Sequence, residues 1–241
     1  MLDPTVDPRY ELVYWPIPFR GCFVSYLFAY RNEPLAEADV YEEISADQDL
    51  APSEQAIPFI GPPVLHDRKM GRSISQMPAI VHYVAPDLGL QPEDPRDQAY
   101  AMKVLMDCND LLMEICRYNG SIMWERDAWI EFRSRRLPRW MQLFEDLLRR
   151  GIFGTPSVTY ADVAVYALFG NMIRCLPELE SDLRRHAPDV FAHCSLIGAK
   201  ASLAEFVASQ EDDYGKTYCG GQIEASIRRM LALDSTAERS R

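Results

Sequence analysis

The sequence predicts an α/β region followed by an all-helical region, because three features of the chain agree. In the first 90 residues, short apolar runs typical of strands alternate with longer segments typical of helices. Between residues 90 and 95, Pro92, Asp94 and Pro95 interrupt the chain. After this point the apolar residues follow helical spacing only. We therefore expect two domains, residues 1–91 and residues 92–241.

The first region should contain a β-α-β unit followed by a β-β-α unit, with its helices on one face of a sheet. Pro16 and Pro18 end the first apolar run, as expected after a buried strand. The expected elements are a strand at 11–15, a helix at 23–30, a weaker strand at 35–41, strands at 62–65 and 72–74, and a helix at 76–84.

The second region should open with a helix capped by Asp94, with Pro95 in its first turn. Residues 159–162, Thr-Tyr-Ala-Asp, have the pattern of a capping box before an apolar helix. The expected helices span 99–118, 124–149 with an interruption at Pro138, 163–175, 180–185 and 195–208. No candidate site is assigned to residues 202–241.

The composition narrows the classes of partner. A net charge of −11 makes nucleic acid and anionic membrane surfaces poor partners. Six cysteines without a CxxC pair indicate free thiols in a reducing compartment rather than disulfides or a metal site. The four histidines show no ligand spacing. The first residues lack a basic segment followed by an apolar run, so we expect a cytoplasmic protein.

Three segments resemble those of the cytosolic glutathione S-transferases, in the right order. Residues 12–30, Leu-Val-Tyr-Trp-Pro-Ile-Pro-Phe-Arg-Gly-Cys-Phe-Val-Ser-Tyr-Leu-Phe-Ala-Tyr, resemble the first strand and helix of the tyrosine-type mu, pi, alpha and sigma classes. Residues 63–65 and 75–80 resemble the cis-proline strand and the Gln-Ser-x-Ala-Ile segment, and residues 159–165 the helix-opening motif of the second domain. The resemblance implies a thioredoxin-like N-terminal domain, a C-terminal helical bundle, glutathione as co-substrate, no metal, and a homodimer.

The resemblance implies that Tyr14 is the catalytic tyrosine and that Arg20 lies beside it. A free thiol has a pKa of roughly 8.5, so little of it is thiolate at neutral pH. A phenol that donates a hydrogen bond to the sulfur favours the thiolate, and so does a nearby cation. The alternative is that Tyr14 is an ordinary core aromatic. Cys22 is a rival nucleophile, although a structural role is expected for it.

Further residues acquire implied roles. The N-terminus of the helix after residue 75 should hold the γ-glutamyl carboxylate through free backbone N–H groups, unless it is an ordinary surface cap. Asp107, with Asp110 as a competing candidate, would reach the amino group of glutathione across a dimer, unless both belong to a solvated helix face. The implied glutathione-binding residues are Trp15, Gly61, Pro62, Pro63, Gln76, Met77 and Asp107. The implied residues of the hydrophobic substrate pocket are Met113, Tyr118 and Trp124, with Trp129 also considered and core packing as the alternative. Phe59 is the candidate for the aromatic side chain that enters the partner subunit of the implied dimer.

The sequence departs from the family pattern in three places. Met77 stands where the family has Ser or Thr, and residues 33–67 contain no Lys or Arg to hold the glycine carboxylate of glutathione. Arg68, Lys69 or Arg72 would have to substitute. Pro62 has no N–H for the cysteinyl backbone of glutathione; if Pro62 itself is the cis residue, Gly61 would donate instead.

Three functions therefore remain open. The first is conjugation of glutathione to a small hydrophobic electrophile. The second is non-catalytic binding of an apolar ligand on the same fold, and the third is thiol–disulfide or dehalogenation chemistry at Cys22.

Overall fold

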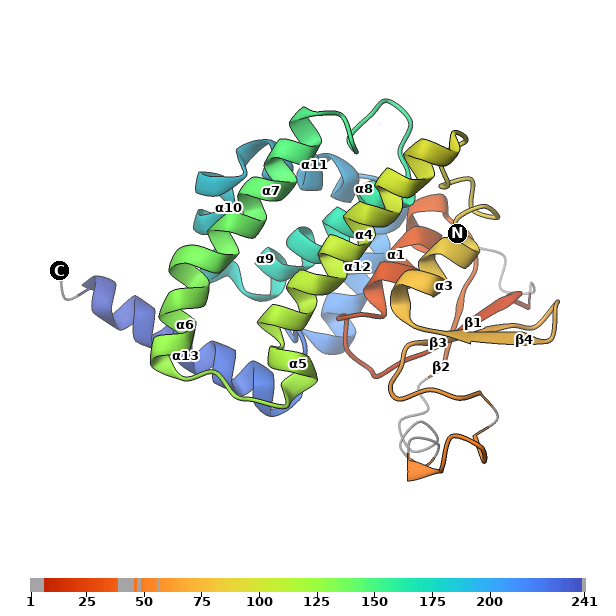
Figure 1. The fold of residues 1–241 in the computed structure, drawn as a ribbon, viewed down its shortest axis with the longest axis horizontal. Coiled ribbons are helices and arrows are strands. Elements are labelled where there is room, and N and C mark those ends of the chain that lie inside the picture. The colour runs from red at the N-terminus through yellow and green to blue at the C-terminus, as the bar shows by residue number, and fades with distance from the viewer. Residues whose placement is uncertain (1–6, 39–45, 47–48, 56, 240–241) are drawn as a thin grey trace.

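The computed structural model describes residues 7–38, 46, 49–55 and 57–239. Its sheet has the strand order β2-β1-β3-β4, in which β2 is parallel to β1 and the other neighbours are antiparallel. The strands are β1 (Tyr10–Val13), β2 (Ala36–Ala38), β3 (Val64–Asp67) and β4 (Arg72–Ser75). Helices α1 (Cys22–Arg31) and α3 (Met77–Val84) lie between the sheet and the helical region (Figure 1).

The second region is helical throughout, and one hydrophobic core continues from it into the sheet region. Its elements are α4 (Pro95–Ile115), α5 (Arg117–Gly120), α6 (Arg126–Glu131), η1 (Phe132–Arg136), α7 (Leu137–Arg149), α8 (Tyr160–Val165), η2 (Tyr166–Gly170), α9 (Asn171–Cys175), η3 (Pro177–Leu179), α10 (Glu180–His186), α11 (Pro188–Gly198), α12 (Ala201–Tyr214) and α13 (Gly221–Arg239). The predicted fold class, a thioredoxin-like region followed by a helical bundle, is confirmed.

Capping side chains begin two of these helices as the sequence predicted. The Asp94 carboxylate accepts a hydrogen bond from the N–H of Arg96 at 2.7 Å and so caps α4. At α8, Thr159 and Asp162 form a capping box, and the Asp162 carboxylate also accepts the N–H of Gly154 at 2.6 Å. Asp162 is fully buried, so this carboxylate ties the preceding loop to the helix start.

Three predicted helices are broken where local geometry prevents a continuous α-helix. The helix expected over 124–149 passes through a π-helical turn, η1, directly before Pro138, which has no N–H for the regular ladder. The helix expected over 163–175 contains η2, and its Gly170 lies against the Tyr166 ring. The helix expected over 195–208 is wrong, because α11 ends at Gly198 and α12 begins after Lys200, whose ψ of 118° is extended.

Smaller differences concern strand ends. The first strand ends at Val13 rather than at residue 15, and β2 begins one residue later than expected. Residues 39–41 of the expected strand lie outside the described residues. Within the described residues, no single helix has the length and apolar character needed to cross a membrane; α11 and α12 meet that requirement only together, with a bend of 92° between them.

Candidate functional site

The strand register brings three distant chain segments to one end of the sheet. Val13 at the end of β1 is paired with Val64 at the start of β3, and Val64 is paired with Ser75 at the end of β4. The residues just outside these pairs therefore meet: those after Val13, those before Val64 and those after Ser75. This end of the sheet faces α4 of the helical region across a cavity.

The cavity has a volume of about 640 Å³. Of the residues that the structure describes, seventeen line it: Tyr14, Trp15, Ile17, Phe19, Arg20, Ile60, Gly61, Pro62, Pro63, Gln76, Met77, Asn109, Met113, Cys116, Asn119, Cys219 and Ile223. A volume of this size lies within the range of small-molecule sites. The wall combines apolar side chains with a few polar groups, as such sites do.

Tyr14 lies at the cavity wall, directly after β1. Its side chain is only 8% exposed, and its hydroxyl oxygen accepts the backbone N–H of Arg20 at 2.9 Å. Burial raises the pKa of Tyr14 well above its ordinary value, so the phenol stays protonated at neutral pH. Among the described residues, no acceptor for the Tyr14 O–H is found, which leaves this hydrogen available to a ligand in the cavity.

Close packing fixes the Tyr14 ring. A Cβ atom on Gly21 would lie 2.5 Å from Cδ1 of Tyr14, closer than real Cβ contacts come. Only a glycine at position 21 therefore lets the first turn of α1 approach the ring. The hydroxyl and the N-terminus of α1 are held together as one unit.

Arg20 carries the positive charge of the cavity. Its Nη1 donates a hydrogen bond to Oδ1 of Asn109 at 2.7 Å, and its Nη2 donates to Sδ of Met113 at 3.0 Å and to Oδ1 of Asn119 at 3.1 Å. All three acceptors are neutral. Among the described residues, no carboxylate lies within ion-pair distance of this guanidinium.

The peptide segments on the other side of the cavity come from the strand ends. The bond between Pro62 and Pro63 is cis, so Pro63 is the cis residue, and Pro62 before it has no N–H to offer. Gln76, with a φ of 73°, precedes α3, and the buried Met77 is the first residue of that helix. The N-terminus of α3, with the backbone N–H groups of its first turn, therefore lies at the cavity wall.

Comparison with known proteins agrees with this arrangement. A family model described as glutathione S-transferase, C-terminal domain, matches residues 100–230, which is more than half of the chain. The chain belongs to the glutathione S-transferase family. No curated protein matches the sequence significantly.

Several solved structures share the fold at low sequence identity. A Pi-class glutathione S-transferase of Onchocerca volvulus has a TM-score of 0.69 at 19% identity, over 88% of this chain and 98% of that chain. A prostaglandin synthase D of Nilaparvata lugens has a TM-score of 0.69 at 15% identity, over 84% and 99%. A glutathione S-transferase of Ascaris lumbricoides has a TM-score of 0.67 at 18% identity, over 84% and 98%. At these identities the similarity concerns the fold.

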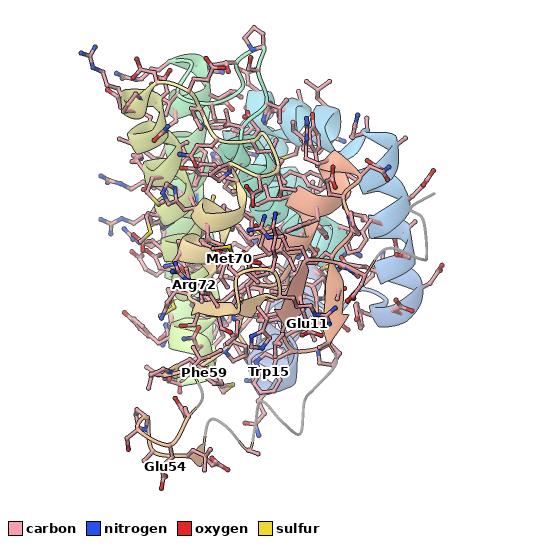
Figure 2. All side chains as sticks on the ribbon, turned by 90° about the vertical axis from the view of Figure 1, so that its right-hand side faces the viewer. Glu11, Trp15, Glu54, Phe59, Met70 and Arg72 are labelled. Atoms are coloured by element: carbon pink, nitrogen blue, oxygen red, sulfur yellow. The ribbon has the colours of Figure 1, made fainter. Side chains whose placement is uncertain are left out.

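The cations proposed to replace the family's glycine-carboxylate ligands lie elsewhere in this family member. Arg68, Lys69 and Arg72 belong to the β3–β4 hairpin, and Asp67 pairs with Arg72 at the end of the sheet opposite to the cavity. Figure 2 shows Arg72 at the hairpin, apart from Trp15. Arg68 is paired with Asp7 and Glu11. None of the three lines the cavity.

The acidic candidates on α4 also point away from the cavity of their own chain. Asp107 forms an ion pair with Lys103, one turn earlier on the same helix. Asp110 is exposed. Asn109 and Met113, four residues apart on the helix, line the cavity instead.

The three predicted substrate-pocket residues are separated in the structure. Met113 lines the cavity. Tyr118 is 64% exposed and is not part of the lining, whereas Trp124 is buried, donates its indole N–H to the carbonyl of Ile115 and packs on Trp129. The apolar spacing that suggested a pocket stripe therefore reflects core packing at Trp124 and Trp129. Phe59 is half-buried on the segment before β3, near the level of Trp15 (Figure 2).

Cys22 is unsuited to be the nucleophile. Its thiol is buried and donates to the carbonyl of Phe19 at 2.9 Å, and burial raises its pKa well above the usual range. All six cysteines are free. Among the described residues, no group of three or more His, Cys, Asp or Glu side chains is arranged to hold a metal ion.

Eight lining residues escaped the sequence analysis: Ile17, Phe19, Ile60, Asn109, Cys116, Asn119, Cys219 and Ile223. Asn109 was detectable, since it lies one helical turn before Met113. Asn119 precedes Gly120, an Asn-Gly pair typical of turns. Cys219 and Ile223 correct the expectation that residues 202–241 carry no part of a site.

Proposed function

We propose that this protein is a glutathione transferase that conjugates the glutathione thiolate to a small hydrophobic electrophile. The observation that carries the proposal is the Tyr14 hydroxyl, which is a protonated donor with no protein acceptor among the described residues, at the wall of a cavity. Glutathione is the co-substrate, and the chemistry proposed for Tyr14 and Arg20 needs no metal.

The proposed chemistry requires the thiol of glutathione to ionise more easily than in water. Lowering its pKa by ~1 to 2 units needs ~1.4 to 2.7 kcal/mol of preferential stabilisation of the thiolate. A hydrogen bond to a charged acceptor contributes about 1.5–3 kcal/mol, so the Tyr14 O–H alone is of the right strength. The uncancelled charge of Arg20 adds to it. The thiol proton would pass to solvent, and the thiolate sulfur would form a bond to the electrophilic carbon. With an aryl halide, the carbon–halogen bond would break and the halide ion would leave through the cavity.

The two ends of glutathione would be held unequally. The γ-glutamyl carboxylate would accept the first N–H groups of α3, with Gln76 beside it. Met77 offers a backbone N–H but no hydroxyl. Among the described residues that line the cavity, Arg20 is the only Lys or Arg, so they offer no second cation to the glycine carboxylate. We therefore expect glutathione to bind weakly for its family.

The test is conjugation of glutathione to a generic aryl halide by the wild type and by Tyr14→Phe. Loss of one donor worth ~1.4 to 2.7 kcal/mol should lower kcat/KM about 10- to 100-fold. Tyr100→Phe, which removes an exposed phenol from α4, is the matched control and should leave the rate unchanged. An active wild type with an equally active Tyr14→Phe variant would contradict the role of Tyr14.

A second candidate function is non-catalytic binding of an apolar ligand in the same cavity. The absence of an N–H at Pro62, of a hydroxyl at residue 77 and of a second cation in the lining favours it. Calorimetry separates the two candidates. No heat at millimolar glutathione, together with heat from an apolar aromatic ligand, would support the binding function.

The proposal includes a homodimer in the cytoplasm. The six free cysteines, five of them buried, fit a reducing compartment. Phe59, half-buried on the segment before β3, remains the candidate for the side chain that enters the partner subunit. In such a dimer, Asp107 would act on the partner's glutathione rather than on the cavity of its own chain.

A further inference from the structure

Arg20 is held by a set of neutral acceptors, which we call the neutral cradle: Asn109, Met113 and Asn119. Two of them come from one face of α4, and the third comes from the turn that follows that helix. The guanidinium therefore donates its hydrogen bonds to groups that fix its position and do not neutralise its charge. A carboxylate at either asparagine position would make the same contact and neutralise the cation.

The turn that carries Asn119 has an unusual backbone. Arg117, Tyr118 and Asn119 have φ values of 47°, 56° and 56°, and Gly120 follows with 79°. Three successive left-handed residues other than glycine are rare, and such conformations persist only where the surroundings fix them.

Several contacts fix this turn. The Arg117 guanidinium stacks on the Trp124 ring at 4.7 Å, and the N–H of Asn119 donates to Sγ of Cys116 at 3.3 Å. Gly120 donates to the carbonyl of Cys116 at 2.6 Å and lies against Ile223 of α13. The result is that the turn after α4 holds the Asn119 amide within hydrogen-bond distance of Arg20.

We propose that Asn109 and Asn119 are positioning residues, which hold the Arg20 guanidinium at the cavity and leave its full charge to act on a bound thiolate. The inference rests on the proposed function, since it concerns the same thiolate. The two asparagines act through Arg20, whereas Tyr14 and Arg20 would act on the sulfur directly.

The first experiment uses the full chain, glutathione and the Asn109→Asp variant. The new carboxylate is nearly isosteric and would pair with Arg20, so the pKa of the bound thiol should rise by about one unit. The rate kcat/KM below that pKa should then fall about tenfold and recover at higher pH. Thermal stability should stay equal or rise, because an ion pair replaces a neutral contact.

The matched control is Asn32→Asp. Asn32 ends α1 with a φ of 55° and does not line the cavity. Asn32→Asp makes the same change of side chain and charge outside the cavity lining and should leave the thiol pKa as in the wild type. The readout is the ultraviolet absorbance of the bound thiolate as a function of pH, with the rate as a second measurement.

The second experiment tests whether the asparagines act through Arg20. Asn109→Ala should lower kcat/KM severalfold in the wild type and change little in an Arg20→Ala background. Asn119→Gly keeps the left-handed turn, removes the amide, and should lower the rate two- to threefold without loss of thermal stability. Equal effects of Asn109→Ala in both backgrounds would overturn the positioning role.

The outcomes separate the two proposals. If wild-type protein leaves the thiol pKa of glutathione at its value in water, the proposed function fails, and this inference fails with it. If the wild type lowers that pKa and Asn109→Asp behaves like Asn32→Asp, the neutral cradle is refuted while the proposed function stands. A raised thiol pKa in Asn109→Asp alone, with retained stability, confirms the cradle.

Discussion

Gly21→Ala should disable the site by displacing Tyr14. The added Cβ would lie 2.5 Å from Cδ1, 2.9 Å from Cγ and 3.1 Å from Cε1 of the Tyr14 ring. Ordinary contacts begin at 3.4 Å, so the ring would have to retreat by about 0.9 Å. These atoms are the near part of a ring that is 8% exposed, so neither a rotation at its tip nor movement into solvent relieves the contact.

Gly21→Ala should also lower the free energy of unfolding. Overpacking of a well-filled site costs about 1–3 kcal/mol. Gly21 has helical dihedrals, a φ of −61° and a ψ of −35°, so alanine would gain about 0.4–1 kcal/mol of backbone entropy there and offset only part of this cost. We expect a net loss of about 0.5–2 kcal/mol in the free energy of unfolding, measured by urea denaturation.

The functional effect should be larger than the loss of stability suggests. A shift near 1 Å in a group that must face the reacting sulfur can lower the rate about 100-fold. The assay is kcat/KM for conjugation, with Gly71→Ala as the control, because nothing lies within 4 Å of a Cβ at that hairpin glycine. Gly71 has a φ of 58°, so its variant should lose some stability and keep the rate.

A double-mutant cycle decides whether the hydroxyl is the cause. In a Tyr14→Phe background the ring still clashes with residue 21, but there is no hydroxyl left to misplace. Gly21→Ala should therefore lower the rate of Tyr14→Phe much less than that of the wild type. An equal fall in both backgrounds would refute the reasoning.

Three further predictions concern the frame around the site. The Arg9 guanidinium holds the pKa of buried Asp67 well below its usual range. The stabilisation from this ion pair is therefore present above pH ~4 and is lost as the pH falls. The difference in unfolding free energy between wild type and Asp67→Asn, measured by urea denaturation, should shrink below pH ~4. Asp162→Asn should lose roughly 2–4 kcal/mol of unfolding free energy, since the carboxylate accepts three hydrogen bonds, whereas the exposed Asp97→Asn should lose less than about 0.5 kcal/mol. Phe59→Ser should shift a dimer toward monomers in light scattering, and an unchanged mass would remove Phe59 from the interface.

Local patterns were enough to predict most elements, whereas Tyr14 and Arg20 were singled out by the family resemblance. In the structure both residues lie between β1 and α1; Tyr14 was expected within the first strand, which ends one residue before it. The capping box at Thr159 was local information. Gly198 was a helix-stop signal in the sequence, and the predicted helix at 195–208 failed because that signal was ignored.

The cavity wall could not be predicted in the same way. Cys219 and Ile223 are about 200 residues from Tyr14 in the chain, and only the docking of α13 brings them together. Trp124 was expected in the substrate pocket but lies in the core. The sequence pattern cannot separate these two cases, because apolar residues at helical spacing occur both on core-facing and on cavity-facing surfaces of helices. Arg68, Lys69 and Arg72 were considered as ligands of the glycine carboxylate of glutathione. The strand register shows that their hairpin lies at the end of the sheet opposite to the cavity.

The distribution of charge within the molecule argues for an anionic ligand more strongly than the total charge argues against one. Asp and Glu make up 36 of 241 residues, so about two or three would be expected among 17 chosen at random. The described residues of the lining include no Asp or Glu, and they include Arg20. Exposed carboxylates more than ~8 Å away are largely screened at physiological ionic strength, whereas a part-buried guanidinium at the wall is not. An acidic protein can therefore present one locally positive cavity, and the neutral cradle is what keeps it positive.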